Sequence, residues 1–182
     1  MANKRKQVLI LSGSPRKGGN SDLLCDQFAK GAQEAGHTVE KIRICEKKIA
    51  PCLGCYYCQT HKDQCAIKDD MPTIVDKIMV ADVLVLACPV YFYSINAQLK
   101  AVIDRCVRSW ERIANKEFYY IMTAAEDAKH TMDTTLACLR GFADCLEGSQ
   151  ECGVLYGKGA YEKGDVKQLP VFEQAYKMGK SV

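Results

Sequence analysis

Apolar and polar positions repeat along the chain with two different periods. Five short apolar runs have the length of a β-strand and lie at about residues 7–11, 37–44, 82–87, 117–122 and 152–156. Segments with apolar positions at helical spacing follow them, beginning at residue 20 or 21 and extending over about 69–80, 95–112, 131–146 and 170–178. These periods predict strands and helices in alternation.

This alternation predicts an α/β fold in which five parallel strands form one doubly wound sheet with helices on both faces. The run DVLVLA at residues 82–87 is apolar almost throughout, as in a central parallel strand that is covered on both faces. We expect a single domain over 1–182, because no linker or repeat interrupts the pattern. Ligands of such sheets bind beside the loops that follow the strands, which are residues 12–20, 46–68, 89–94, 123–129 and 157–165.

Charge and hydropathy narrow the classes of function. The 182 residues carry a net charge of +3, which is too small and too dispersed for a nucleic-acid-binding surface. The apolar run VLIL near the start is too short for a signal peptide, and no segment approaches the length of a membrane span. We therefore expect a cytoplasmic protein that binds neither nucleic acid nor a membrane.

The chain has eleven cysteines, and their odd number and the missing signal peptide disfavour a secreted disulfide scaffold. Seven lie singly in apolar or helical stretches, where we predict that they pack as small buried side chains: Cys25, Cys45, Cys88, Cys106, Cys138, Cys145 and Cys152. The other four lie close together in one predicted loop, so they need a separate explanation.

The segment SGSPRKGGNS follows the first strand and leads into the first helix. A helix N-terminus offers unpaired N–H groups and a partial positive charge, and the hydroxyls and cations of this segment add donors for a phosphate. It is not a Walker A loop, because Gly18 is followed by Gly19 and not by Lys and Ser or Thr. It is not a Gly-x-Gly-x-x-Gly fingerprint either, because Pro15 occupies the position of the second glycine. A terminal phosphate monoester fits, with flavin mononucleotide (FMN) as the obvious candidate.

The segment CLGCYYCQTHKDQC carries Cys52, Cys55, Cys58 and Cys65. Two-residue gaps between the first three suit the corners of a [4Fe–4S] cluster, with Cys65 as the more distant fourth ligand. Zinc fits less well, because it usually takes two separated pairs of ligands. Free or redox-active thiols remain open as a third interpretation. The predicted topology places this loop at the ligand-binding edge of the sheet.

Three motifs together resemble the NADPH-dependent FMN reductases and iron–sulfur flavoproteins of the flavodoxin-like superfamily. SGSPRKGGNS looks like their first loop, PVYFYSINAQLKAVIDR is similar to their second loop and its helix, and CLGCYYCQTHKDQCAIKDDM resembles the cysteine loop of the iron–sulfur flavoproteins. The motifs lie in matching order along about two-thirds of the chain. The resemblance implies a flavodoxin-like sheet with strand order 2-1-3-4-5.

The resemblance also implies a set of FMN-binding residues at three loops. The phosphate ligands would be Ser12, Ser14, Arg16, Asn20 and Ser21. The edge of the isoalloxazine ring would contact Pro89, Val90, Tyr91, Phe92, Tyr93 and Ser94. A third flavin-side contact would come from Thr123, Ala124 and Ala125.

These features predict an FMN-dependent oxidoreductase. It would accept electrons from NAD(P)H or a ferredoxin-type donor and pass them to a quinone, a flavin or an iron–sulfur acceptor, which is a small molecule or a protein. We assign no catalytic residue, because the flavin carries out the chemistry. A flavodoxin-like carrier without turnover and a structural or regulatory flavin-binding dimer are the alternatives. We also expect a homo-oligomer, either a dimer or a tetramer.

Overall fold

The computed structural model describes residues 4–62 and 64–182, and its sheet has five parallel strands in the order β2-β1-β3-β5-β6. The parallel strands are β1 (Gln7–Ser12), β2 (Thr38–Arg43), β3 (Val83–Tyr91), β5 (Glu117–Thr123) and β6 (Gln150–Gly157). Counted along the parallel strands alone, this is the predicted order 2-1-3-4-5, so the flavodoxin-like prediction is confirmed. The short strand β4 (Ser94–Ile95), which was not predicted, pairs antiparallel with the end of β3.

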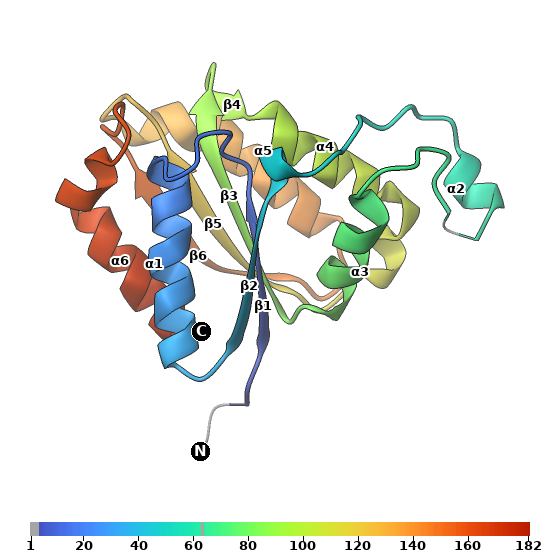
Figure 1. Ribbon diagram of the computed structural model, residues 1–182, viewed down its shortest axis with the longest axis horizontal. Coiled ribbons are helices and arrows are strands. Elements are labelled where there is room, and N and C mark those ends of the chain that lie inside the picture. The colour runs from blue at the N-terminus through green and yellow to red at the C-terminus, as the bar shows by residue number, and fades with distance from the viewer. Residues whose placement is uncertain (1–3, 63) are drawn as a thin grey trace.

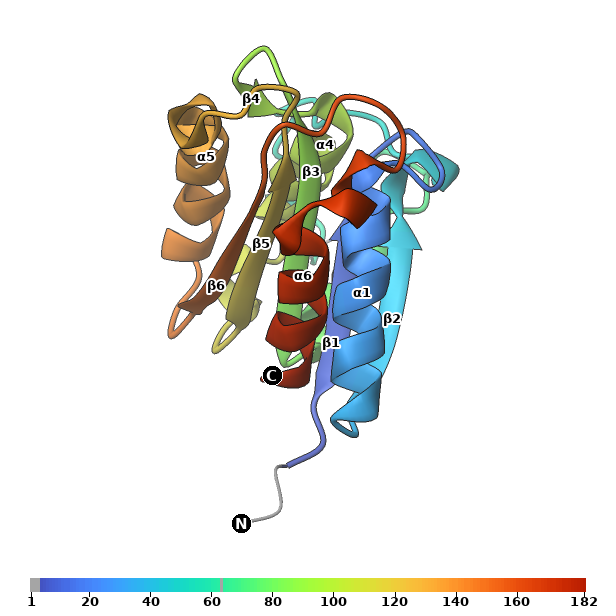
Figure 2. The same cartoon turned by 90° about the vertical axis from the view of Figure 1, so that its left-hand side faces the viewer.

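Helices cover both faces of the sheet, as Figures 1 and 2 show. The helices are α1 (Asn20–Glu34), α2 (Tyr57–Thr60), α3 (Met71–Val80), α4 (Ala97–Arg105), α5 (Asp133–Asp144) and α6 (Pro170–Lys180). Helices α1 and α6 pack side by side on one face, and α3, α4 and α5 lie on the other. Each face has its own core of buried side chains. Within the described residues, no helix combines the length and the apolar character needed to cross a bilayer.

The helix predicted over 95–112 is shorter than expected. Its first residue, Ile95, belongs to β4 and pairs with Val90 of β3, so helix α4 begins only at Ala97. After Arg105 the chain continues as two short 3-10 helices, Cys106–Arg108 and Trp110–Arg112. The apolar spacing could not reveal either end, because a hairpin and 3-10 turns bury similar side chains.

The prediction that seven single cysteines are buried is only partly right. Cys25, Cys88 and Cys106 are buried, and burial raises the pKa of the Cys88 and Cys106 thiols to about 12. Cys138 is half-buried, whereas three others are exposed: Cys45, Cys145 and Cys152. The exposed three lie outside the buried faces, in a 3-10 turn, at the C-cap of α5 and on the edge strand β6.

Candidate functional site

Three loops that follow β1, β3 and β5 meet around one cavity of about 190 Å³ at the carboxyl edge of the sheet. Most of the flavin-site residues predicted from the sequence line it: Ser14, Arg16, Asn20, Ser21, Pro89, Val90, Tyr91, Thr123, Ala124 and Ala125. The first and third loops are joined directly, since the hydroxyls of Ser21 and Thr123 lie 2.7 Å apart and share a hydrogen bond. The fold thus brings together segments that are far apart in the sequence.

The first loop forms a tight turn in front of helix α1. Gly18 has a φ of +64°, in the left-handed region that disfavours L side chains. The Gly19 N–H donates to the Arg16 carbonyl oxygen at 2.9 Å, and the Arg16 N–H donates to Ser14 Oγ at 3.3 Å. The side chains of Ser14 and Arg16 therefore lie beside the first turn of α1, whose N–H groups lack intrahelical acceptors. This arrangement fits a phosphate group.

Asp22 holds this loop from beneath. Its buried carboxylate accepts the Gly18 N–H at 2.8 Å and the Ser12 hydroxyl at 3.3 Å, and it lies 3.0 Å from Lys41 Nζ and 3.5 Å from Arg43 Nε. Burial alone would raise the pKa of Asp22, but the hydrogen bonds from Gly18 and Lys41 and the two cations lower it below its usual value. Ser12, predicted as a phosphate ligand, thus lies under the loop.

A fourth segment, after β6, completes the cavity wall with Ala160 and Tyr161. Asn20 anchors it: its Nδ2 donates to the carbonyl oxygens of Ala160 at 3.1 Å and Glu162 at 2.8 Å, and its Oδ1 accepts the Gly164 N–H at 2.9 Å. In the sequence, only its position after the last predicted strand marks this loop. That position is the signal that could have identified these two residues.

The second loop is a tight hairpin between β3 and β4. Tyr91 pairs with Ser94 across the turn, and Phe92 and Tyr93 between them have φ values of 50° and 59°. Phe92 is fully exposed, and the Tyr93 hydroxyl donates to Glu126 Oε1 at 2.7 Å. Of these predicted flavin contacts, Tyr91 lines the cavity, and Phe92, Tyr93 and Ser94 are not among its lining residues.

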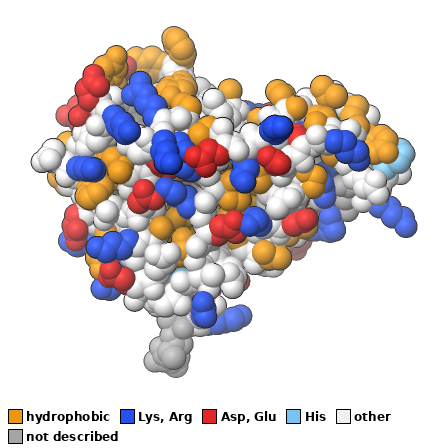
Figure 3. Space-filling model, in the orientation of Figure 1, with side chains coloured by type: hydrophobic (Ala, Val, Ile, Leu, Met, Phe, Trp, Pro, Cys, Tyr) orange, Lys and Arg blue, Asp and Glu red, His pale blue; other side chains and the backbone are white. Residues whose placement is uncertain are grey.

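The cysteine loop projects from the same side of the molecule, beyond α3 and α4 (Figure 1). One cavity of about 210 Å³ is lined by all four cysteines of the loop, Cys52, Cys55, Cys58 and Cys65. Leu53, Tyr56 and Tyr57 also line it. Hydrophobic side chains also gather on the outer surface of this projection (Figure 3). Among the described residues, no three metal-ligating side chains converge on a single point.

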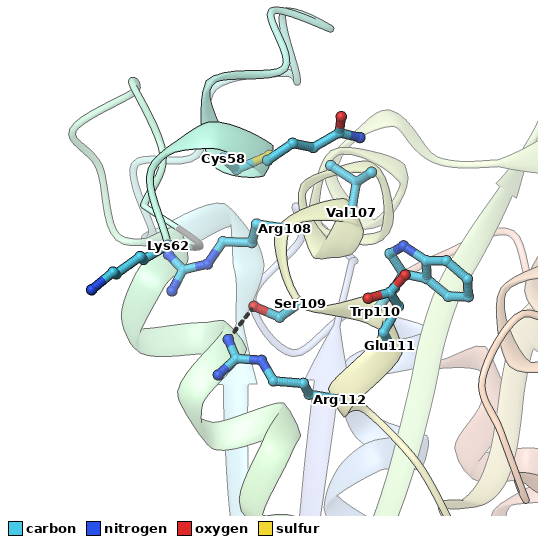
Figure 4. Close-up of a pocket in the computed structure, with 9 residues that line it drawn as sticks. Cys58, Lys62, Val107, Arg108, Ser109, Trp110, Glu111 and Arg112 are labelled. Carbon is cyan, nitrogen blue, oxygen red and sulfur yellow. Dashed lines mark hydrogen bonds between the residues drawn. The ribbon is translucent and has the colours of Figure 1, made fainter.

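A second cavity, of about 380 Å³, separates the cysteine loop from the segment that follows α4. Figure 4 shows Cys58 and Lys62 on the loop side and residues 107–112 on the other, and Lys62 and Arg108 both line the cavity. Arg112 Nη2 donates to Ser109 Oγ at 3.1 Å. Basic side chains therefore border the cysteine loop.

A flavodoxin-like sheet with a phosphate-type loop after its first strand and further loops around the same cavity defines a protein of the flavodoxin-like class. The sequence profile of the NADPH-dependent FMN reductases matches residues 7–148. The chain belongs to this family.

Curated relatives match slightly more than half of the chain. An iron-sulfur flavoprotein of Methanosarcina thermophila is 40% identical over 101 residues, which are 56% of this chain and 52% of the relative. An iron-sulfur flavoprotein of Methanocaldococcus jannaschii is 39% identical over 99 residues, 54% of this chain and 51% of the relative. The chain thus spans about half the length of the curated relatives it matches.

Solved structures share the whole fold. The azoreductase AzrA superposes with a TM-score of 0.77 at 14% identity and covers 97% of this chain and 100% of its own. An NAD(P)H:quinone oxidoreductase from Methanothermobacter marburgensis superposes with a TM-score of 0.70 at 19% identity, covering 97% of this chain and 96% of its own. At these identities the likeness concerns the fold.

Proposed function

We propose that this protein is an FMN-dependent oxidoreductase, which takes electrons from NAD(P)H or a ferredoxin-type donor and passes them to a quinone, a flavin or an iron–sulfur acceptor. The observation that carries the proposal is the cavity at the carboxyl edge of the sheet, which is lined by residues from all three segments that the resemblance assigns to the flavin. Bound FMN would supply the hydride and single-electron chemistry.

The residues of the cavity have separate roles in this proposal. Ser14, Arg16 and the N-terminus of α1 bind the FMN phosphate, because they bring a hydroxyl, a cation and free N–H groups to one point. Residues 89–91 and 123–125 border the flavin ring with main-chain groups and with the Tyr91 side chain. These residues bind and orient the cofactor, and none of them has to act as an acid or a base.

The test compares FMN with riboflavin, which lacks the phosphate. Wild-type protein should bind FMN far more tightly, and Ser14→Asp should lose most of that affinity because a carboxylate repels the phosphate dianion. Equal affinities for the two flavins, measured by fluorescence titration, would contradict the phosphate site. Steady-state oxidation of NAD(P)H with a quinone or flavin acceptor then separates an enzyme from an electron carrier, which would show no turnover.

The proposal includes a [4Fe–4S] cluster held by Cys52, Cys55, Cys58 and Cys65. It is supported by the spacing of the four cysteines, by the mainly apolar cavity that all four line, and by the names of the curated relatives, which are iron-sulfur flavoproteins. Such a cluster would supply one-electron transfer. Anaerobically purified protein should contain iron and acid-labile sulfide. Stoichiometric FMN without iron, sulfide or zinc would leave free or redox-active thiols, and zinc without iron would indicate a zinc site.

We also propose that the chain forms a homo-oligomer, as a dimer or a tetramer. Leu53, Tyr56 and Phe92 are large apolar side chains exposed on the loops at the carboxyl edge of the sheet, where a second copy would cover them. Sedimentation velocity of the FMN-loaded protein measures the assembly. A monomer at micromolar concentration would contradict this part of the proposal.

A further inference from the structure

The cysteine loop leaves and rejoins the fold through a narrow neck. The Ala50 N–H donates to Asp69 Oδ2 at 3.0 Å, and the Lys48 N–H donates to Asp70 Oδ2 at 2.8 Å. The Asp70 N–H in turn donates to the Lys48 carbonyl oxygen at 2.9 Å. The two sides of the neck, on either side of residues 51–68, are therefore hydrogen-bonded to each other.

Arg105, the last residue of α4, closes this neck from the body of the fold. Its Nη1 and Nη2 donate to the two carboxylate oxygens of Asp69 at 2.7 and 3.0 Å, and Nη1 also donates to the Ala50 carbonyl oxygen at 2.8 Å. Nη2 also donates a hydrogen bond to Cys65 Sγ at 3.4 Å. One guanidinium thus contacts both sides of the neck and the fourth cysteine.

This ion pair is almost fully buried, with side-chain exposures of 2% for Arg105 and 6% for Asp69. Burial alone would raise the pKa of Asp69, but the hydrogen bonds from Arg105, Ala50 and Met71 lower it below its usual value. Removing either partner of such a buried pair is strongly destabilising, because the other charge is then left unpaired in the interior. Lysine cannot replace the arginine, since its single ammonium lacks the planar fork that reaches several acceptors.

We propose that Arg105 is a positioning residue for the cysteine loop: with Asp69 it closes the neck, and its free N–H holds Cys65 at the wall of the cavity that the other three cysteines line. The cavity is therefore shaped before a ligand arrives. The role of Arg105 toward Cys65 rests on the proposed function, because it requires that the four thiols hold the cluster. An N–H donated to a ligand sulfur also raises the reduction potential of a cluster.

The first test uses iron-free protein, so it does not depend on the cluster. Arg105→Lys should open the neck, and the Lys48 and Ala50 amides should exchange hydrogen about tenfold faster because charged hydrogen bonds are lost. Arg140→Lys is the matched control. Arg140 of α5 also makes a bidentate ion pair, with Glu151 of β6 at 2.7 Å for both contacts, but this pair is exposed and does not contact the cysteine loop. Unchanged exchange at the neck in folded Arg105→Lys overturns the proposal.

The second test uses protein loaded with iron and sulfide. If the lost hydrogen bond changes the one-electron equilibrium about tenfold, Arg105→Lys should lower the cluster midpoint potential by about 59 mV and lose iron faster to a chelator. A wild-type potential and iron retention in this variant would contradict the role toward Cys65. If Arg105→Lys does not fold, the pair Arg105→Met with Asp69→Asn removes both charges together and serves both tests. Wild-type protein that takes up no iron refutes the proposed cluster, while the exchange comparison still decides the role of Arg105 at the neck.

Discussion

The contact between α1 and α6 predicts a large loss of stability from one added methyl group. At Gly179 of α6, a Cβ atom would lie 2.0 Å from the carbonyl oxygen of Phe28 and 2.8 Å from its carbonyl carbon. The contact is reciprocal, because a Cβ at Gly31 of α1 would lie 2.1 Å from the carbonyl oxygen of Tyr176. Both neighbours are backbone atoms in helices, so neither can rotate away, and α6 would have to move by about 1 Å or more to restore normal packing distances.

Overpacking of this kind costs about 1–3 kcal/mol, and the obstruction by backbone puts Gly179→Ala at about 2 kcal/mol or more. The matched control is Gly141→Ala in the interior of α5, where nothing lies within 4 Å of the added Cβ. There alanine should increase the free energy of unfolding by about 0.5–1 kcal/mol through helix propensity. The two variants should therefore differ by about 3 kcal/mol, or about 6–12 °C in Tm for a chain of this size.

The assay is urea unfolding followed by far-ultraviolet circular dichroism, with the m-value checked in each variant. An unchanged m-value with a lower midpoint for Gly179→Ala assigns the loss to the folded state. If Gly179→Ala were as stable as wild type, α1 and α6 would not be packed backbone to backbone, and the reasoning would be wrong. Gly31→Ala should repeat the loss from the other side of the contact.

Three further predictions follow from the loops. Cys55→Ala should remove iron while FMN stays bound, measured by metal analysis and absorbance, and Cys138→Ala should leave both intact; iron retained in the first variant would exclude this thiol as a ligand. The pKa of Asp22 is lower in the folded protein than in the unfolded chain, so its carboxylate stabilises the fold above about pH 4. This stabilisation is lost as the pH falls through the pKa of Asp22 in the folded protein. The stability advantage of wild type over Asp22→Asn, measured by urea unfolding, should therefore shrink below about pH 4. Tyr93→Gly relieves the strain of a positive φ, which should raise the free energy of unfolding by about 1 kcal/mol, and it also removes the hydrogen bond to Glu126, which lowers this gain. A loss of stability in this variant would show that the hydrogen bond outweighs the strain.

The strands, the helices and the loops between them could be predicted from local features of the sequence, whereas the sheet order and the individual cavity residues were implied by the resemblance of the motifs to a known family. Apolar periodicity determines which segments are strands, and the right-handed crossover rule then brings the ends of β1, β3 and β5 to one edge. Ser14, Pro89 and Thr123 lie at or just after the carboxyl ends of those strands, so their convergence could be expected without coordinates. The FMN contacts themselves stay predictions until a flavin titration tests them.

Two features that the sequence could not predict depend on a partner distant in the chain. Asp69 and Asp70 precede helix α3, and the Met71 N–H donates to Asp69 at 3.1 Å. The larger role of Asp69, its bond to Arg105, joins residues 36 positions apart and has no local signal. Asn20 was similarly assigned to the phosphate, although its amide is bonded to the loop after β6.

The hairpin at Phe92 and Tyr93 is the place where the local sequence conflicts with the backbone. A two-residue turn with positive φ at both central positions favours asparagine and glycine, whereas here two large aromatic residues occupy it. Such strain persists only where the surroundings hold it, and here pairing of Tyr91 with Ser94 and the bond from Tyr93 to Glu126 do so. Folding alone gains nothing from a fully exposed Phe92 ring, so the strain is best understood as the cost of presenting aromatic surface beside the flavin cavity, where an electron acceptor or a second subunit would contact it.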